Sequence, residues 1–155
     1  MRPGSYNQLY IHLVISPHRS TPIRSLHHQE LVFKFIAGLI NSMGSKSLAV
    51  NGMHDHVHIF FGWKPKPGMS IPDFVKELKR AATNYIKQEN LMQDFRWQAG
   101  YGAFSYSQSS VDNVIKYIVN QKEHHSKKTF KKEYVKMLKD FEAEYDQEGL
   151  FDFHE

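Results

Sequence analysis

The order in which apolar patterns follow one another is the feature that most limits what this chain can fold into. Residues 8–15 alternate apolar and other side chains and predict a strand. Apolar residues recur at helical spacing over residues 31–43 and predict a helix, with Gly44 placed to end it. Residues 46–51 then predict a second strand that turns into a third strand over residues 55–61, and we expect these two strands to pair antiparallel.

A second helix is predicted after the proline-rich loop at residues 63–68. Ser70 and Asp73 have the spacing of a capping box, and residues 71–85 carry an apolar helical stripe. Residues 95–106, rich in aromatic side chains, predict an irregular fourth strand or strand pair. The order strand, helix, strand, strand, helix, strand predicts an α+β fold of the ferredoxin-like kind, an antiparallel sheet with two helices on one face.

Further elements follow the fourth strand. The polar residues 105–110 are typical of a joint, and residues 111–119 predict an additional C-terminal helix that carries Tyr117. From about residue 126 to about residue 141 we expect a charged helical tail. The length of 155 residues, with 41% apolar side chains and no internal repeat, predicts one globular domain over residues 1–155.

The amino-acid composition excludes several kinds of functional site. The chain has no cysteine, which excludes disulfides, thiolate metal sites and cysteine nucleophiles and is typical of a reducing compartment. Residues 1–8 contain no apolar run of signal-peptide length, and no later stretch is long enough to span a membrane. We therefore expect a soluble, cytoplasmic protein without a membrane partner.

Charge is distributed unevenly along the chain. Residues 140–155 contain seven of the 16 acidic residues and no Lys or Arg, although the whole chain has a net charge of +4. Removing these seven acids leaves nine acidic against 20 basic residues, a net charge of +11 for the preceding chain. A positive charge of this size is suited to binding a polyanion such as nucleic acid. The alternative interpretation is a lysine-rich surface that is only solvated.

Two histidines in the third predicted strand are candidate metal ligands. Side chains alternate across a strand, so His56 and His58 project from one face. We expect the two predicted helices to cover the other face, which carries Leu9, Ile11, Val57 and Ile59. Neutral imidazoles bind divalent metals, and a pair of them leaves coordination positions open for further ligands. The alternative is a pair of histidines that merely satisfy local hydrogen bonds.

The predicted third helix is free to cross the histidine face. Tyr117 lies about 130° from the centre of its apolar stripe, and Gln121 stands on the same side one turn later. A phenol is a poor nucleophile at neutral pH unless its target is polarised, which a divalent ion can do for a phosphate. The Gln121 carbonyl oxygen could complete a ligand set of two histidines and one glutamine. Taken alone, Tyr117 is more often a packed tyrosine, and Gln121 is more often a surface glutamine.

Other residues of the same types remain as alternatives. Tyr101 and Tyr106 are rival phenols, which we expect to pack in the fourth-strand region. His124 and His125 are rival imidazoles, and we rank them lower because neighbouring side chains on a helix point in divergent directions. His54 lies in the predicted turn before the third strand and could cap it.

Four motifs occur in an order that resembles one known family. They are DHVH at residues 55–58, LKR at 78–80, WQAGYGAFS at 97–105 and YIVNQ at 117–121. From about residue 6 to residue 130 the chain resembles the single-tyrosine HUH transposases of small bacterial insertion sequences, the IS200/605 type. It is close to the transposase-like proteins associated with repetitive extragenic palindromes.

The resemblance implies an enzyme that cleaves and rejoins single-stranded DNA at hairpins of element ends. It implies that His56, His58 and Gln121 hold a divalent ion, Mg²⁺ or Mn²⁺, and that Tyr117 attacks a phosphodiester. This chemistry gives a 5′-phosphotyrosine link and a free 3′-hydroxyl. The resemblance also implies a homodimer in which one subunit can complete the site of the other.

Three expectations concern DNA binding and alternative functions. The basic residues Lys79 and Arg80 are candidate DNA contacts, with solvated helix charges as the alternative. One alternative function is a domesticated hairpin-DNA-binding protein that acts on repetitive palindromes without mobilising its own gene. A nickase that initiates replication or plasmid transfer is a third possibility, but such proteins usually carry additional domains.

Overall fold

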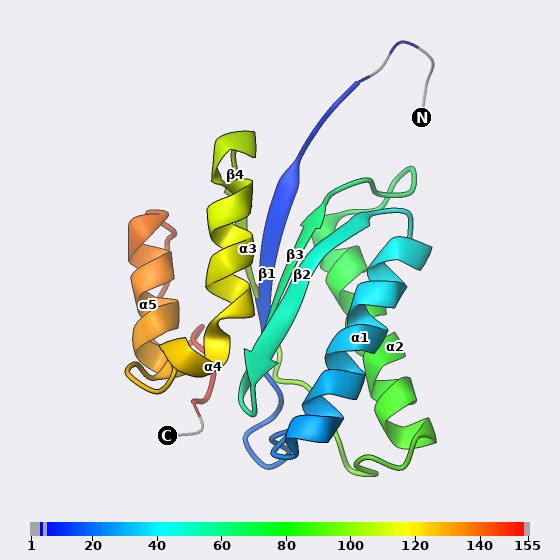
Figure 1. Ribbon diagram of the computed structural model, residues 1–155, viewed down its shortest axis with the longest axis vertical. Helices are drawn as coiled ribbons and strands as arrows, with labels where there is room; N and C mark the ends of the chain where they lie inside the picture. The colour runs from blue at the N-terminus through cyan, green and yellow to red at the C-terminus, as the bar shows by residue number, and fades with distance from the viewer. Residues whose placement is uncertain (1–3, 5, 154–155) are drawn as a thin grey trace.

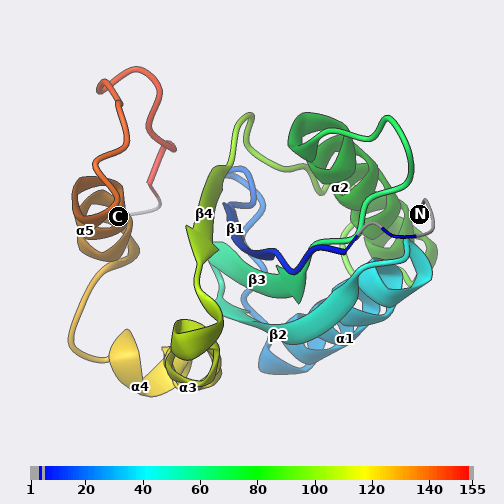
Figure 2. The ribbon, with the colours of Figure 1, turned by 90° about the horizontal axis from the view of Figure 1, so that it is seen from above.

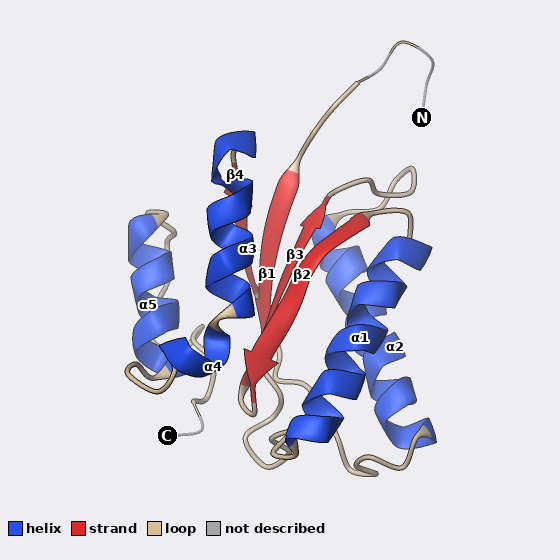
Figure 3. Cartoon of the chain, in the orientation of Figure 1, coloured by secondary structure: helices blue, strands red, loops and turns tan. Residues whose placement is uncertain are grey.

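Four strands form one antiparallel sheet in the computed structural model, which describes residue 4 and residues 6–153. The spatial order is β2-β3-β1-β4, and Figures 1 and 3 show helices on both faces of the sheet. The sheet and the two helices on its first face are β1 (Tyr10–Ile15), α1 (Leu26–Ser42), β2 (Lys46–Met53), β3 (His56–Gly62), α2 (Ile71–Gln88) and β4 (Gly102–Tyr106). This topology confirms the predicted ferredoxin-like fold. The predictions that involve residues 1–3, residue 5 and Glu155 lie outside the described residues.

Helices α1 and α2 cover the face that strand alternation predicts. The side chains of Leu13, Val57 and Ile59 point to this side and are fully buried in the main core. Leu9 was expected on the same face, but this prediction was wrong because Leu9 precedes β1 and is 49% exposed. Burying one large aliphatic side chain contributes about 1.5 to 3 kcal/mol, so this core dominates the stability of the sheet half.

Local signals begin the two covering helices. Ser25 caps α1 by accepting a hydrogen bond from the His28 backbone N–H. Ser70 and Asp73 form the predicted capping box at the start of α2, each side chain bonding the backbone of the other residue. These caps satisfy backbone donors that a helix cannot pair internally.

The fourth strand is shorter than the aromatic segment that predicts it. β4 covers only Gly102–Tyr106, and the preceding residues contribute one isolated bridge, between Pro17 and Trp97. Gly100, with a φ of +86°, turns the chain between the bridge and the strand. The Gln98 side chain donates hydrogen bonds to Ser16 and Pro17, which fastens this irregular segment to the end of β1.

A second layer of helices lies on the opposite face of the sheet. It consists of a short 3-10 turn η1 (Gln108–Ser110), α3 (Val111–Val119), α4 (Gln121–His124) and α5 (Phe130–Asp140). Figure 2 shows this layer across the sheet from α1 and α2. α3 packs on Phe60 of β3 through Val114 and Ile118, and α5 packs on β1 and β4 through Phe130 and Tyr134.

The predicted charged tail is therefore an amphipathic helix with an apolar inner face. No helix among the described residues is long and apolar enough to cross a membrane.

Two glycine substitutions test how closely β2 packs against β3, the strand that carries His56 and His58. Gly52 in β2 lies opposite Val57, and an added Cβ would stand 2.1 Å from the His56 carbonyl oxygen. Gly52→Ala should therefore lower the free energy of unfolding by about 1 to 3 kcal/mol through overpacking. The control is Gly38→Ala in α1, where an added Cβ meets nothing within 4 Å. It should raise stability by about 0.5 to 1 kcal/mol, and denaturant unfolding would measure both changes. Equal effects of the two substitutions would contradict this packing.

Candidate active site

Strand β3 holds two fully buried imidazoles on the face away from α1 and α2. Nδ1 of His56 lies 2.7 Å from a carboxylate oxygen of Asp55. Nδ1 of His58 lies 2.7 Å from Nε2 of His12, a buried residue of β1. Both rings are thus held through Nδ1, which leaves each Nε2 to face the added helices.

The carboxylate of Glu133, on α5, lies in the middle of the imidazoles. Its Oε1 is 3.0 Å from Nε2 of His58, 3.1 Å from Nε2 of His125 and 3.5 Å from Nε2 of His56. Burial alone would raise the pKa of this carboxyl, but hydrogen bonds from His125 and His58 outweigh burial and hold the pKa well below its usual range. Burial likewise opposes protonation of His125, yet the bond to Glu133 raises the pKa of that imidazole. A buried, ionised carboxylate therefore marks the centre of the cluster.

Tyr117 and Gln121 meet the other oxygen of the same carboxylate. The Tyr117 hydroxyl donates a hydrogen bond to Oε2 of Glu133, and Nε2 of Gln121 lies 3.3 Å from that atom. Oε1 of Gln121 is 2.9 Å from Nε2 of His56. Burial and the charge of Glu133 both raise the pKa of the Tyr117 phenol, so the phenol is protonated in this arrangement. The structure thus brings together His56, His58, Tyr117 and Gln121 within one chain.

Contacts from β2 position the segment that carries Tyr117 and Gln121. The Asn51 side chain donates hydrogen bonds of 3.0 Å to the carbonyl oxygens of Ile118 and Val119, which lie at the end of α3. α3 stops there, and Gln121 begins the separate short helix α4 rather than the next turn of one helix. The Lys122 ammonium group donates a hydrogen bond of 2.9 Å to the Gly52 carbonyl oxygen, which holds α4 against β2.

The donor atoms fit a divalent cation. One ring nitrogen each of His56, His58 and His125 and a Glu133 carboxylate oxygen all lie within 4.8 Å of one another. Neighbouring ligands of an octahedral ion with bonds of about 2.1 Å stand about 3.0 Å apart, close to the shorter of these separations. Because Nδ1 of His56 faces the Asp55 carboxylate, its Nε2 lone pair in the neutral ring would face the Gln121 oxygen, an arrangement that a cation between them would stabilise.

His12 belongs to the support of this cluster. If His58 offers the Nε2 lone pair, its Nδ1 carries the proton and donates it to Nε2 of His12. His12 must then carry its own proton on Nδ1, which is buried and has no hydrogen-bond partner. Burial, followed by repulsion from His58, holds the pKa of His12 well below its usual range. The contact with His12 thus holds the His58 ring with its Nε2 toward the site.

Three residues of the cluster were not among the predicted site residues. His125 was placed below the predicted set, but its ring and that of His124 reach different oxygens of Glu133, at 3.1 and 3.8 Å. Their divergence at the end of α4, which motivated the lower rank, lets one carboxylate approach both rings. Glu133 had a signal in the sequence, because it is an acid on the apolar stripe of α5. His12 had another signal, because it is a polar residue within the apolar strand β1.

The other rivals lie apart from the ligand atoms. Tyr101 packs against the core on the α1 and α2 side, and Tyr106 packs against Phe60 and Phe141 on the other face. His54 lies in the turn before β3, with Nε2 4.0 Å from a carboxylate oxygen of Asp55.

Lys79 and Arg80 lie on α2, which covers the sheet face opposite the one that carries the imidazoles. The ammonium group of Lys79 donates to the carbonyl oxygens of Gln98 and Gly100 at 2.8 and 2.7 Å, and burial lowers its pKa to about 8. Arg80 is exposed and paired with Glu77. Their role as DNA contacts stays a prediction, and the geometry gives Lys79 a structural role as well.

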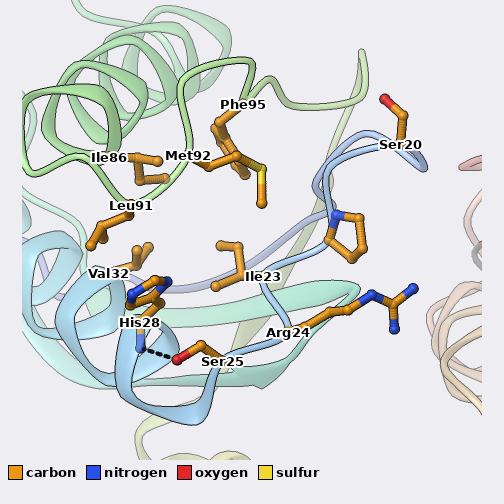
Figure 4. Close-up of a pocket in the computed structure, with 11 residues that line it drawn as sticks. Ser20, Ile23, Arg24, Ser25, His28, Val32, Ile86, Leu91, Met92 and Phe95 are labelled. Carbon is orange, nitrogen blue, oxygen red and sulfur yellow. Dashed lines mark hydrogen bonds between the residues drawn. The ribbon is translucent and has the colours of Figure 1, made fainter.

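A separate cavity of about 360 Å³ opens between α1, the end of α2 and the segment after β1. Figure 4 shows its mostly apolar walls, formed by side chains such as Ile23, Ile86 and Phe95, with Arg24 at one side. It contains one imidazole, that of His28, and none of the cluster residues. The cavity therefore shares no residue with the cluster of imidazoles, Tyr117 and Glu133.

Residues 5–121 match the family model described as Transposase IS200 like. The chain belongs to this family. The match ends at Gln121, so His125 and Glu133 of this IS200-like transposase lie beyond the matched segment. No curated protein matches the chain.

Two solved structures share the fold of this transposase. One is a "putative transposase" from Deinococcus radiodurans R1, with 22% identity and a TM-score of 0.59, covering 78% of this chain and 96% of that one. The other is a REP-associated tyrosine transposase bound to a REP hairpin, with 9% identity and a TM-score of 0.55. That alignment covers 81% of this chain and 74% of the other.

Metal binding can be measured on this transposase without DNA. Titration with Mn²⁺ should raise the melting temperature, because an ion that binds only the folded state stabilises it. Glu133→Gln should weaken Mn²⁺ affinity by at least about 10-fold in calorimetric titration, since a ligand should matter no less than a supporting residue. The matched control Glu123→Gln, an exposed acid of α4, should leave affinity unchanged. Equal affinities for wild type and Glu133→Gln would remove Glu133 from the ligand set.

A second measurement tests the structural role of Lys79. Lys79→Met leaves two carbonyl oxygens without their donor and should lower the free energy of unfolding by about 1 to 3 kcal/mol. Arg80→Ala removes only an exposed ion pair and should leave the unfolding midpoint unchanged. Chemical denaturation of both variants checks this, and an unchanged midpoint for Lys79→Met would contradict it.

Proposed function

We propose that this transposase cleaves and rejoins single-stranded DNA through a covalent link to Tyr117. The observation that carries the proposal is the shared carboxylate, since Tyr117 binds one oxygen of Glu133 while His58 and His125 approach the other. The proposed nucleophile and the proposed metal ligands are thus close enough to act on one phosphate group. If Tyr117, His58 and His125 had only separate structural roles, they would not need to meet at one carboxylate.

In the proposed reaction the Tyr117 oxygen forms a bond to phosphorus while the bond from phosphorus to the 3′ oxygen breaks. The phenol loses its proton, and the 3′ oxygen leaves with the electron pair and takes up a proton, so the charge balances. The products are a 5′-phosphotyrosine and a free 3′-hydroxyl. Attack by the 3′-hydroxyl of another strand reverses the step and reseals the DNA without an external energy source.

The residues around the phenol have separate tasks in this reaction. Glu133 orients the Tyr117 hydroxyl, and its Oε2 is the first acceptor in the path of the departing proton. His56, His58 and Gln121 would hold the cation, with His125 and Glu133 as additional ligands. A bound Mg²⁺ or Mn²⁺ supplies positive charge that polarises the phosphate and offsets the charge of the transition state.

The partner of this site is proposed to be a DNA hairpin with a single-stranded flank at an element end. A bound REP hairpin in one structure of similar fold supports this substrate class, as does the net positive charge of residues 1–139. The homodimer remains a prediction. Contact of Tyr117 with Glu133 inside one chain favours a site that each subunit can complete with its own tyrosine.

A covalent adduct is the direct test of the proposal. The full chain is incubated with Mn²⁺ and single strands copied from the DNA that flanks its gene, and the products are separated under denaturing conditions. Wild type should give a protein–DNA adduct, while Tyr117→Phe should lower its yield by about 1,000-fold or more because the nucleophile is gone. Chelation of the metal should abolish the adduct, and so should His56→Ala in a protein with an unchanged circular dichroism spectrum.

The matched control is Tyr101→Phe, which removes another phenol from a position across the sheet and should leave the yield unchanged. An adduct that persists in Tyr117→Phe would show that the nucleophile is another residue. Tight hairpin binding by wild type without any adduct would instead support the regulatory, non-cleaving alternative.

A further inference from the structure

A cleft of about 370 Å³ separates α3 from α5 beside the candidate active site. Tyr117 and Glu133 line its inner end. One wall carries Tyr106 and Asn113, and the opposite wall carries Lys128, Lys136 and Phe141, among other residues. The cleft therefore connects the reactive phenol with solvent between two helices of the added layer.

The cleft is the open side of the cluster. His12, His56, His58 and Gln121 are fully buried against the sheet, so no ligand can approach the phenol past them. Tyr117 is only partly buried, and its ring faces the cleft together with His124. A phosphate that reaches the Tyr117 oxygen must therefore bring a neighbouring part of its strand into the cleft.

An exposed aromatic ring stands on the wall formed by α5. Phe141 follows the last residue of α5 and is 38% exposed, although rings of Phe104 and Tyr106 support it at centroid distances of 4.9 and 5.2 Å. Supported but exposed rings are the usual platforms on which unpaired bases stack.

The charges of the cleft favour an anion. Lys128 and Lys136 line it, and α5 exposes further lysines at 131, 132 and 139. The carboxylate at the rim, Asp140, is paired with Lys136 at 2.5 Å, and Glu133 at the inner end is engaged by the imidazoles. Lys128 has no ion-pair partner among the described residues, so its ammonium group is the cation best placed to meet a backbone phosphate.

We propose that this cleft binds one unpaired nucleotide next to the attacked phosphate, with its base stacked on Phe141 and its backbone held by Lys128. The inference rests on the proposed function for the position of the reaction. The volume suits a ligand the size of a nucleotide and excludes a duplex, whose bases face inward. A single-stranded segment meets all three requirements of the cleft: a planar base, a negative charge and a narrow cross-section.

Binding to simple oligomers tests the base contact without any reaction. The full chain is mixed with fluorescent dT8 and with a spacer of eight abasic sugar phosphates, in EDTA, and anisotropy gives the two dissociation constants. Wild type should bind dT8 more tightly than the spacer, and Phe141→Leu should lose about 5-fold or more of this preference, because one stacked base contributes that much. Leucine keeps an apolar side chain in contact with Phe104, so the fold should be retained.

Two controls separate stacking from general effects. Tyr145→Leu removes another exposed ring, which lies outside the cleft, and should leave the preference unchanged. Phe141→Trp should retain it. Lys128→Ala should weaken binding to both oligomers and reduce the slope of log affinity against log salt by roughly 0.7, the value for one phosphate contact on a single strand. Lys87→Ala on α2 should leave the slope unchanged.

The outcomes distinguish this inference from the proposed function. An adduct at Tyr117 together with equal dT8 preference in wild type and Phe141→Leu would overturn the cleft proposal and leave the transposase chemistry intact. Loss of preference in Phe141→Leu without an adduct under any condition would support the nucleotide site while the cleavage proposal fails. A wild type that binds the spacer as tightly as dT8 would also overturn the stacking contact.

Discussion

The buried carboxylate of Glu133 is the interaction on which the second half of this molecule depends. An ionised group without partners in such a place would cost several kcal/mol, so α5 can pack here only if the imidazoles and the phenol are in position. The same contacts hold the rings and the phenol in fixed orientations. Packing of the added layer and assembly of the site are thus one event.

The part of the site that lies on the sheet could be predicted from the sequence because strand geometry is local. Alternation places His56 and His58 on one face whatever else the chain does, and the apolar residues between them choose the opposite face for the core. The Ser70 capping box is equally local and was confirmed. Helix periodicity also placed Tyr117 away from the apolar stripe of α3, in the direction from which α5 approaches.

What the sequence did not reveal is the return of the chain after α4. Glu133 lies 75 residues from His58, and only the turn between α4 and α5 brings the two together. The many lysines of residues 126–141 predict only a charged helical tail, yet the stripe of Phe130, Tyr134 and Leu138 binds that tail to the sheet. A single acid on this stripe was the available signal, and recognising it required knowing what the stripe packs against. Lys79 shows the converse, since its charge suggested a partner outside the protein while its ammonium group bonds two carbonyl oxygens within it.

The division into two layers also separates the stability of this protein from its chemistry. The main core lies between the sheet and the helices α1 and α2, and it contains none of the proposed ligands or the phenol. The two smaller clusters, on the other face, surround the site. A change that loosens α5 would therefore withdraw Glu133 and one wall of the cleft together, while β3 would still present its two imidazoles. Because a smaller apolar cluster holds this layer, its opening should cost less free energy than global unfolding, so the site should open before the main core does.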